Sequence, residues 1–267
     1  MTDPGSPDAY APAEVAARVR DVGVAKVRRD RLGVFLLAML AGAFIALGAV
    51  LFTVVVTGST LGFGPTRLLG GAAFSLGLIL VVIAGAELFT GNNLIAMAWA
   101  SRLITFRELL GNWAIAYAGN LVGALATVAL VVVGRVHEAG EGGVGKTLHA
   151  IATHKLELDL LQAFALGVLC NGLVCLAVWL SLAARSVTDK VLAIVLPIAA
   201  FVAIGFEHSI ANMVFLPWDL VVHGAERASV LAALANLAVV TAGNIVGGTL
   251  LVAGIYWSVY LRPPQNP

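Results

Sequence analysis

Apolar residues fill six long stretches of the chain, and short segments between them carry most of its charge. A helix needs about 20 apolar residues to cross the hydrocarbon core of a bilayer. Each stretch is long enough, so the pattern predicts an all-α membrane protein. The six expected transmembrane helices lie at Leu32–Thr57, Arg67–Ala100, Leu109–Val133, Leu160–Ala184, Val191–Val222 and Ser229–Leu261.

Nearly the same polar sequence interrupts the second and the fifth stretch. Gly85–Asn92 and Gly205–Asn212 both read G-x-E-x-x-x-x-N. A carboxylate inside a span is costly in lipid, and matching interruptions in two halves of a chain are typical of broken helices around a transport site. We therefore expect the second and fifth helices to break near the middle of the membrane.

A second pair of motifs extends this similarity. Gly119–Gly123 in the third stretch reads GNLVG, and Gly243–Gly247 in the sixth reads GNIVG. Helices one to three thus recur as helices four to six, and an odd number of crossings requires the second copy to run inverted. The sequence predicts two inverted three-helix repeats, at about 31–135 and 157–262, within a channel domain at 31–262.

The glycines of the second motif predict close helix packing, since G-x-x-x-G spacing lets two backbones approach. We expect the adjacent Asn120 and Asn244 to hold the broken helices by hydrogen bonds. Glu87 and Glu207 are expected to accept hydrogen bonds from backbone N–H groups freed at each break, with proton relay as the alternative. Two further amides complete the structural residues at the breaks, Asn92 and Asn212.

His208 is the only histidine within a predicted span, and it lies in the second interruption. Because histidine titrates near neutral pH, His208 is a candidate for proton exchange, although a structural role stays open. Thr90 could meet a substrate, face His208 across a pore, or bond to its own helix. The second half of each broken helix would point a positive N-terminal end at the centre, which favours an anion.

Composition supports a membrane protein and narrows its chemistry. The chain is 60% hydrophobic and 12% charged, against about 25% charged residues in a soluble domain. A net charge of +1 gives no reason to expect a nucleic-acid partner. Cys170 and Cys175 lack the spacing of a metal site and are expected to pack, so we expect no metal or cofactor.

Basic residues predict the orientation. With the N-terminus inside, eleven Lys and Arg residues lie on the cytoplasmic side and five on the other, which satisfies the positive-inside rule. Both termini would then be cytoplasmic. Segment 1–30 is expected to hold an amphipathic helix at the cytoplasmic face, with a plain basic flank as the alternative, and its first residues lack the pattern of a cleaved signal peptide. We expect Gly140–Gly145 to be a flexible linker in an outer loop.

Three strings resemble the formate/nitrite transporter family: Leu88–Asn92, Gly119–Gly123 and above all Gly205–Met213, which reads GFEHSIANM. The resemblance covers about Glu14 to Leu261. It implies an aquaporin-like fold, a homopentamer with one pore in each protomer, and a bacterial-type inner membrane.

The resemblance also implies site residues. The family's central histidine matches His208, and the threonine of its broken second helix matches Thr90. With Glu207 and Asn171, these are the residues expected in the substrate pore and in proton exchange. The resemblance implies a cytoplasmic constriction formed by Phe74, Leu78 and Phe89, and a periplasmic constriction formed by Val174 and Phe201. It also implies a vestibule lysine that attracts anions, which is Lys155.

The expected function is a channel for small anions of weak acids. The fifth stretch resembles formate channels and the second resembles nitrite channels, so formate is favoured, nitrite is the alternative and hydrosulfide comes third. An intramembrane enzyme using His208 and Glu207 as acid and base is the alternative from another class. It lacks a nucleophile or metal partner, so we predict that the protein is not an enzyme.

Overall fold

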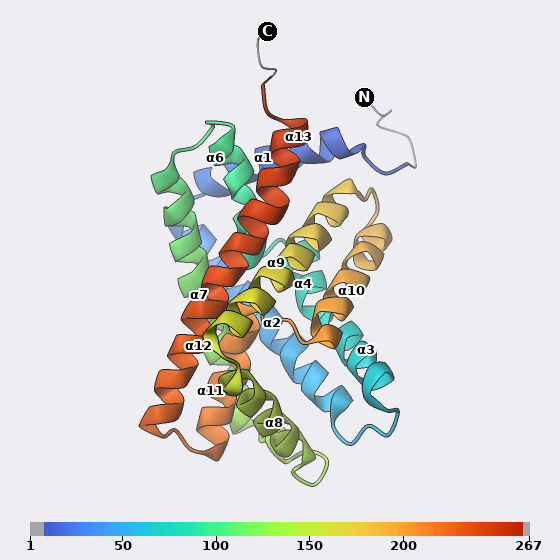
Figure 1. Cartoon of the computed structure of the whole chain (residues 1–267), viewed down its shortest axis with the longest axis vertical. Coiled ribbons are helices and arrows are strands. Elements are labelled where there is room, and N and C mark those ends of the chain that lie inside the picture. Colours follow the sequence, from blue (N-terminus) through green and yellow to red (C-terminus); the bar gives the residue numbers. More distant parts are fainter. Residues whose placement is uncertain (1–7, 264–267) are drawn as a thin grey trace.

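The computed structural model describes residues 8–263, which leaves the first seven residues of the predicted segment 1–30 outside the described part. The helices pack as one elongated bundle (Figure 1). Six helical stretches are long and apolar enough to cross a membrane, as predicted: Arg31–Val56, Phe63–Ala84, Phe106–Val133, Leu160–Ala183, Val187–Ile204 and Ser229–Tyr260.

The described chain contains helices of three kinds. The α-helices are α1 (Pro12–Arg28), α2 (Arg31–Val56), α3 (Phe63–Phe74), α4 (Leu76–Ala84), α5 (Phe89–Asn92), α6 (Ala96–Ala100), α7 (Phe106–Val133), α8 (Gly143–Glu157), α9 (Leu160–Ala183), α10 (Val187–Ile204), α11 (Ser209–His223), α12 (Arg227–Val246) and α13 (Ile255–Tyr260). Two short 3-10 helices are η1 (Asn93–Ile95) and η2 (Val136–Glu138), and η3 (Gly247–Gly254) is a π-helix that joins α12 to α13.

The second and fifth membrane helices are broken, as the sequence predicts. Helix α4 ends at Ala84 and α10 ends at Ile204. The next residues, Gly85 and Gly205, are left-handed glycines with φ of 79° and 91°. Glycine reaches this region without the steric cost that other residues have there. A few residues without helical structure follow each glycine before α5 and α11 begin.

Close backbone contacts explain the GxxxG motifs. A side chain at Gly123 would collide with the Met39 carbonyl of α2, and one at Gly247 would collide with the Val168 carbonyl of α9. Gly119 faces α2 in the same way, and Gly243 faces α9. The two halves therefore use matching contacts, α2 with α7 and α9 with α12, and the inverted relation between the halves stays a prediction.

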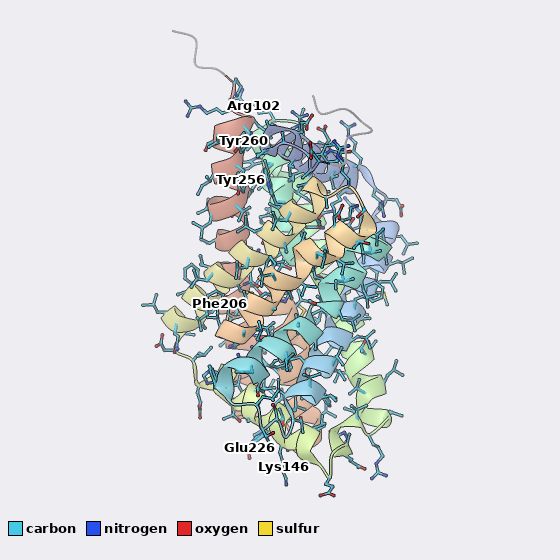
Figure 2. All side chains as sticks on the ribbon, turned by 90° about the vertical axis from the view of Figure 1, so that its right-hand side faces the viewer. Arg102, Lys146, Phe206, Glu226, Tyr256 and Tyr260 are labelled. Carbon is cyan, nitrogen blue, oxygen red and sulfur yellow. The ribbon has the colours of Figure 1, made fainter. Side chains whose placement is uncertain are left out.

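Helices α1 and α8 lie at opposite ends of the bundle (Figure 1). Figure 2 shows Arg102 and Tyr260 at the end near α1, with Lys146 and Glu226 at the other end. The expected flexible linker at Gly140–Gly145 is wrong, because α8 begins at Gly143. Its buried residues Val144, Leu148 and Ala152 give α8 a packed face that the glycine-rich sequence conceals.

Candidate functional site

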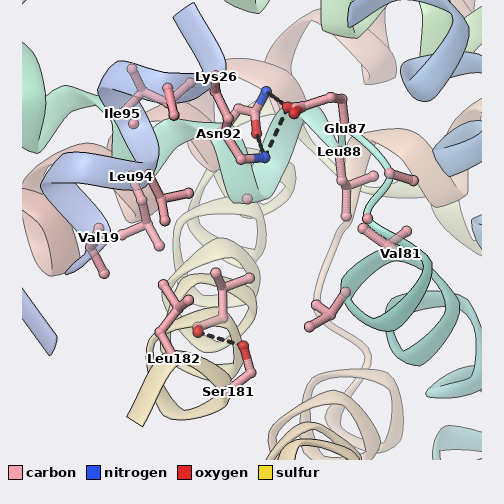
Figure 3. Close-up of a pocket in the computed structure, with 18 of the residues that line it drawn as sticks. Val19, Lys26, Val81, Glu87, Leu88, Asn92, Leu94, Ile95, Ser181 and Leu182 are labelled. Atoms are coloured by element: carbon pink, nitrogen blue, oxygen red, sulfur yellow. Dashed lines mark hydrogen bonds and ion pairs between the residues drawn. The ribbon is translucent and has the colours of Figure 1, made fainter. Parts of the chain in front are cut away.

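Two cavities enter the bundle from its two ends. The first, here called the α1 cavity, measures about 300 Å³ and is lined by Lys26, Leu78, Glu87 and other residues (Figure 3). The second, the α8 cavity, measures about 260 Å³. Lys155, Phe74, Phe201, Glu207 and His208 are among its lining residues. Each cavity thus contains one lysine, one glutamate and an apolar inner wall.

A lysine, a glutamate and two amides form a polar cluster at the α1 cavity. Lys26 Nζ lies 2.8 Å from Glu87 Oε2 and donates to Asn92 Oδ1 at 2.8 Å. Asn92 Nδ2 in turn donates to Glu87 Oε2 and to Asn112 Oδ1 (Figure 3 shows Lys26, Glu87 and Asn92). The buried carboxylate is therefore paired and hydrogen-bonded, as a buried charge must be.

The α8 cavity repeats this cluster with one difference. Lys155 Nζ lies 2.8 Å from Glu207 Oε1, and Asn212 Nδ2 donates to Glu207 Oε2 and to Asn236 Oδ1. Among the described residues, Asn212 Oδ1 has no hydrogen-bond partner, whereas the equivalent atom of Asn92 accepts from Lys26. Lys155 therefore has donor capacity left for another acceptor.

The hydrogen bonds of the two glutamates differ from the expected ones. Both carboxylates accept from lysine and asparagine side chains, as described above, and residues 8–263 provide no backbone N–H donor to either of them. The freed N–H groups bind the two other asparagines: Phe89 N donates to Asn120 Oδ1, and Ser209 N donates to Asn244 Oδ1, each at 2.9 Å. An amide suits this position because it accepts and donates at once.

The donor ends of these asparagines tie each break to a neighbouring helix. Asn120 Nδ2 donates to the carbonyls of Ala38 and Glu87 at 2.8 and 2.9 Å. Asn244 Nδ2 donates to the carbonyls of Gly167 and Glu207 at the same two distances. Each amide thus joins three backbone groups, which is the helix-holding role expected from the sequence.

Thr90 and His208 bring the two breaks together. Thr90 Oγ1 lies 3.0 Å from His208 Nε2, and both side chains are buried. His208 Nδ1 accepts a hydrogen bond from Ala211 N at 3.1 Å, so His208 caps α11. Because Nδ1 is an acceptor, the proton of the neutral ring is on Nε2, and His208 donates to the Thr90 hydroxyl.

An apolar barrier lies beside His208. The Phe201 ring stacks on the His208 ring with a centroid separation of 5.8 Å, and Phe74 meets Phe201 edge-on at 5.7 Å. Phe74 lines the α8 cavity, while Leu78 lines the α1 cavity. Four residues of helix span about 6 Å. The two cavities therefore approach one another to within about one helical turn.

Three expected pore residues have other surroundings. Phe89 packs edge-on against Trp113 and Tyr117 of α7, at 6.2 and 5.0 Å, and is not among the lining residues of either cavity. Val174 is buried in the apolar core. Asn171 lies next to Thr90 as expected but is taken up by hydrogen bonds: its Nδ2 donates to the Asn244 carbonyl and Asn93 Oδ1, each at 2.7 Å, and to the Thr90 carbonyl at 3.3 Å. The wall of the α1 cavity contains Leu88 where Phe89 was expected.

The helix starts at the breaks offer fewer free donors than expected. At α11, Asn244 takes the N–H of Ser209, and His208 takes the N–H of Ala211. These bonds already satisfy donors that would otherwise attract an anion. The positive charges that line the two cavities are therefore those of lysine and arginine side chains.

Arg67, the first residue of the second predicted span, was not among the expected site residues. Its guanidinium donates to the carbonyls of Val202 and Ala203, in the last turn of α10. A cation there complements the negative end of the half-helix. Arg67 also lines the α8 cavity, which adds positive charge to the cavity of Lys155.

Sequence reasoning missed Lys26 and the amides of Asn112 and Asn236. The signal was available in the repeat. Glu87 N donates to the Leu37 carbonyl, and Glu207 N donates to the Leu166 carbonyl, so Leu37 and Leu166 are equivalent positions. Lys26 and Lys155 are separated in the sequence by the same number of residues as Leu37 and Leu166, which makes the two lysines equivalent as well. Helix α1 is therefore placed like α8, which makes it part of the repeated framework and not a separate flank.

The chain resembles known channels over most of its length. Residues 13–258 match the profile of the family described as formate/nitrite transporter. The formate channel FocA of Escherichia coli (strain K12) is 43% identical, with 96% of each chain covered.

Two solved structures are also similar. One is described as a pentameric formate channel with formate bound; its TM-score is 0.77 and its identity 45%, over 87% of this chain and 98% of that one. An FNT family ion channel has a TM-score of 0.83 and 29% identity, over 92% and 98%. On these matches and on the geometry of its broken helices, the chain belongs to the formate/nitrite transporter family.

Proposed function

We propose that this protein is a formate channel, in which each protomer passes the weak acid between the α1 and α8 cavities. The carrying observation is the hydrogen-bonded pair Thr90–His208, which lies beside the apolar barrier between two lysine-containing cavities. The formate channels among its relatives support formate as the substrate. An intramembrane enzyme is excluded, because the family is one of transporters.

Energetics favour passage as the neutral acid. Keeping a carboxylic acid of pKa near 4 protonated at pH 7 costs roughly 4 kcal/mol. Taking a bare anion out of water costs several kcal/mol even after the protein relaxes. The barrier of Phe74, Phe201 and Leu78 is apolar, so these side chains provide no hydrogen bond or charge that would compensate an anion for its lost water. In this proposal the lysines attract the anion to each cavity, and the neutral acid crosses the barrier.

His208 offers the substrate a hydrogen through Nε2. A complete transfer from Nε2 would need a proton to arrive at Nδ1, and that proton would break the hydrogen bond from Ala211 N. After the transfer the ring carries its proton on Nδ1. The bond from Ala211 N is restored when Nδ1 releases that proton and Nε2 takes up another from water, so each exchange uses one proton from solution. Thr90 holds Nε2 until the substrate takes its place.

The vestibule lysines differ in their exposure. The Lys26 side chain is 27% exposed and the Lys155 side chain 11%, and each is paired with a glutamate. Pairing leaves each cavity polar without a bare buried charge. Lys155 Nζ keeps donor capacity for the anion, because Glu207 is its one hydrogen-bond acceptor among the described residues. Glu207 thus positions Lys155 in this proposal and is not itself a proton donor.

Assembly and orientation complete the proposal. A homopentamer is supported by the pentameric formate channel that the chain resembles. Exposed apolar residues on the spans, such as Leu36, Leu130 and Leu196, would face lipid or neighbouring protomers. The positive-inside pattern supports cytoplasmic termini, so the α1 cavity would open to the cytoplasm and the α8 cavity to the outside.

Competing uptake tests the substrate. Purified protein in liposomes is given labelled formate with an excess of unlabelled formate, nitrite or hydrosulfide, in one preparation. We expect formate to compete best, because it is the substrate named for the similar channels. Nitrite competing clearly better than formate would make nitrite the substrate and overturn the assignment.

A further inference from the structure

A cluster of two histidines and one aspartate lies outside the transport path. It joins α8 to α11, which lie together at the end of the bundle opposite α1 (Figure 1). Asp219 Oδ1 lies 3.1 Å from His149 Nδ1 and 2.7 Å from His223 Nδ1. The two imidazole rings are 4.7 Å apart. The two histidine nitrogens and the aspartate oxygen therefore lie close to one another.

The repeated framework does not explain this cluster. The separation that relates Lys26 to Lys155 places Arg20 at the position equivalent to His149. The separation that relates Glu87 to Glu207 places Trp99 and Leu103 at the positions equivalent to Asp219 and His223. The glutamate and asparagine clusters described above occur in both halves and therefore have a shared architectural role. The histidine–aspartate cluster occurs in the second half alone.

The spacing of the donors suits a small transition-metal ion. Ligands about 2.0–2.1 Å from a tetrahedral Zn²⁺ lie about 3.4 Å from one another. The three donor atoms lie within 4.8 Å of one another, so a small side-chain rotation would bring them into register. Imidazole and carboxylate are ligands that Zn²⁺ and related ions accept. His149 and His223 are partly exposed, which gives an ion a path from solvent, while Asp219 is 8% exposed.

We propose that His149, Asp219 and His223 form a binding site for Zn²⁺ or a similar transition-metal ion, which cross-links α8 to α11. Three protein ligands leave a fourth position for water or an external ligand. Helix α8 carries Lys155 and α11 begins next to His208, so the ion would fix the two helices that shape the α8 cavity. This site is independent of the transported anion.

Metal binding is measured on the whole protein, purified with a tag that contains no histidine. Isothermal titration with Zn²⁺ should give one site per protomer, and Co²⁺ should give the strong visible absorption of a tetrahedral complex. We expect His149→Ala and His223→Ala each to weaken Zn²⁺ binding by at least about tenfold, because each removes a ligand. Both side chains are partly exposed, so these variants should keep the oligomeric state and the unfolding temperature of the metal-free protein.

His154→Ala is the matched control, because His154 is on α8 but outside the cluster, and it should bind Zn²⁺ like the original protein. Hydrogen exchange gives a second measurement: Zn²⁺ should slow exchange in α8, and it should not do so in His223→Ala. The proposal is overturned if Zn²⁺ does not saturate one site. It is also overturned if His149→Ala and His223→Ala bind as before, or if His154→Ala loses binding equally.

Discussion

The Thr90 hydroxyl oxygen lies 3.0 Å from His208 Nε2, although 118 residues separate the two in the sequence. This hydrogen bond joins the first broken helix to the second at the point where their extended segments meet. Because His208 Nδ1 is held by the backbone of α11, the geometry fixes which nitrogen can serve a substrate. The predictions below start from this pair.

Replacing His208 with phenylalanine should change the pH response of formate flux while the pentamer persists. Phenylalanine fills a similar volume beside Phe201 but cannot donate a hydrogen to the substrate or to Thr90. Loss of the helix cap should cost about 0.5–2 kcal/mol of stability. Flux into liposomes is compared between pH 5 and 8, the range in which histidine normally titrates. His137→Ala is the control, and an unchanged profile in His208→Phe would refute the role of His208.

Thr90→Val should reduce formate flux, whereas Thr90→Ser should retain most of it. Valine keeps the shape but leaves the buried His208 Nε2–H without its acceptor, at a cost of about 1–3 kcal/mol. If substrate binding in the pore is weakened by about 1.4 kcal/mol, the affinity for formate falls about tenfold. Equal flux in the two variants would mean that the hydroxyl does not matter, and the proposed partner role would then be wrong.

Removing Lys155 should damage the protein chiefly through Glu207. Lys155→Met leaves a buried carboxylate unpaired, which costs about 3–5 kcal/mol. The double variant Lys155→Met with Glu207→Gln should recover most of the thermal stability, though not the flux, because the anion-attracting cation is still missing. Unfolding is measured in detergent, with the exposed Lys146→Met as control. If the double variant were no more stable than Lys155→Met, the proposed pairing energetics would be wrong.

Asn120→Leu and Asn244→Leu should each lower the unfolding temperature strongly. Each change leaves one backbone N–H and two backbone carbonyls at a break without their partner. Unsatisfied buried groups cost about 1–3 kcal/mol each. Thr127→Val is the matched control, because within the described part of the chain the Thr127 hydroxyl bonds to its own helix alone, at the Gly123 carbonyl. A Thr127→Val effect as large as that of Asn120→Leu would show that these amides have no special role.

The sequence predicts the six spans and the two breaks because both leave strong local signals. Long apolar runs identify the spans, and a glycine followed by a glutamate inside such a run identifies each break. Both breaks also contain a polar candidate, Thr90 and His208, but contact between these two side chains was only one of the three alternatives that the sequence left open for Thr90. The family resemblance supplied the remaining candidates.

The cavity linings and hydrogen-bond partners could not be predicted in the same way. Helix α8 has a mixed sequence with two glycines in its first turn, so its helical form depends on packing against α11 and not on local preference. Phe89 follows a break, but the direction of its ring depends on Trp113 and Tyr117, which are distant in sequence. Lys26 lies outside every apolar run. Its pairing with Glu87, which is distant in sequence, depends on how α1 packs against the first break, and the sequence alone does not give that packing.

The movement of charge with formate tests the central claim most directly. Liposomes containing the protein are given a formate gradient, while the internal pH, the external pH and the membrane current are recorded together. Passage as the neutral acid predicts one proton taken up with each formate and no net current. A formate-dependent current without proton uptake would contradict this account, because it would mean that the bare anion crosses the barrier of Phe74, Phe201 and Leu78.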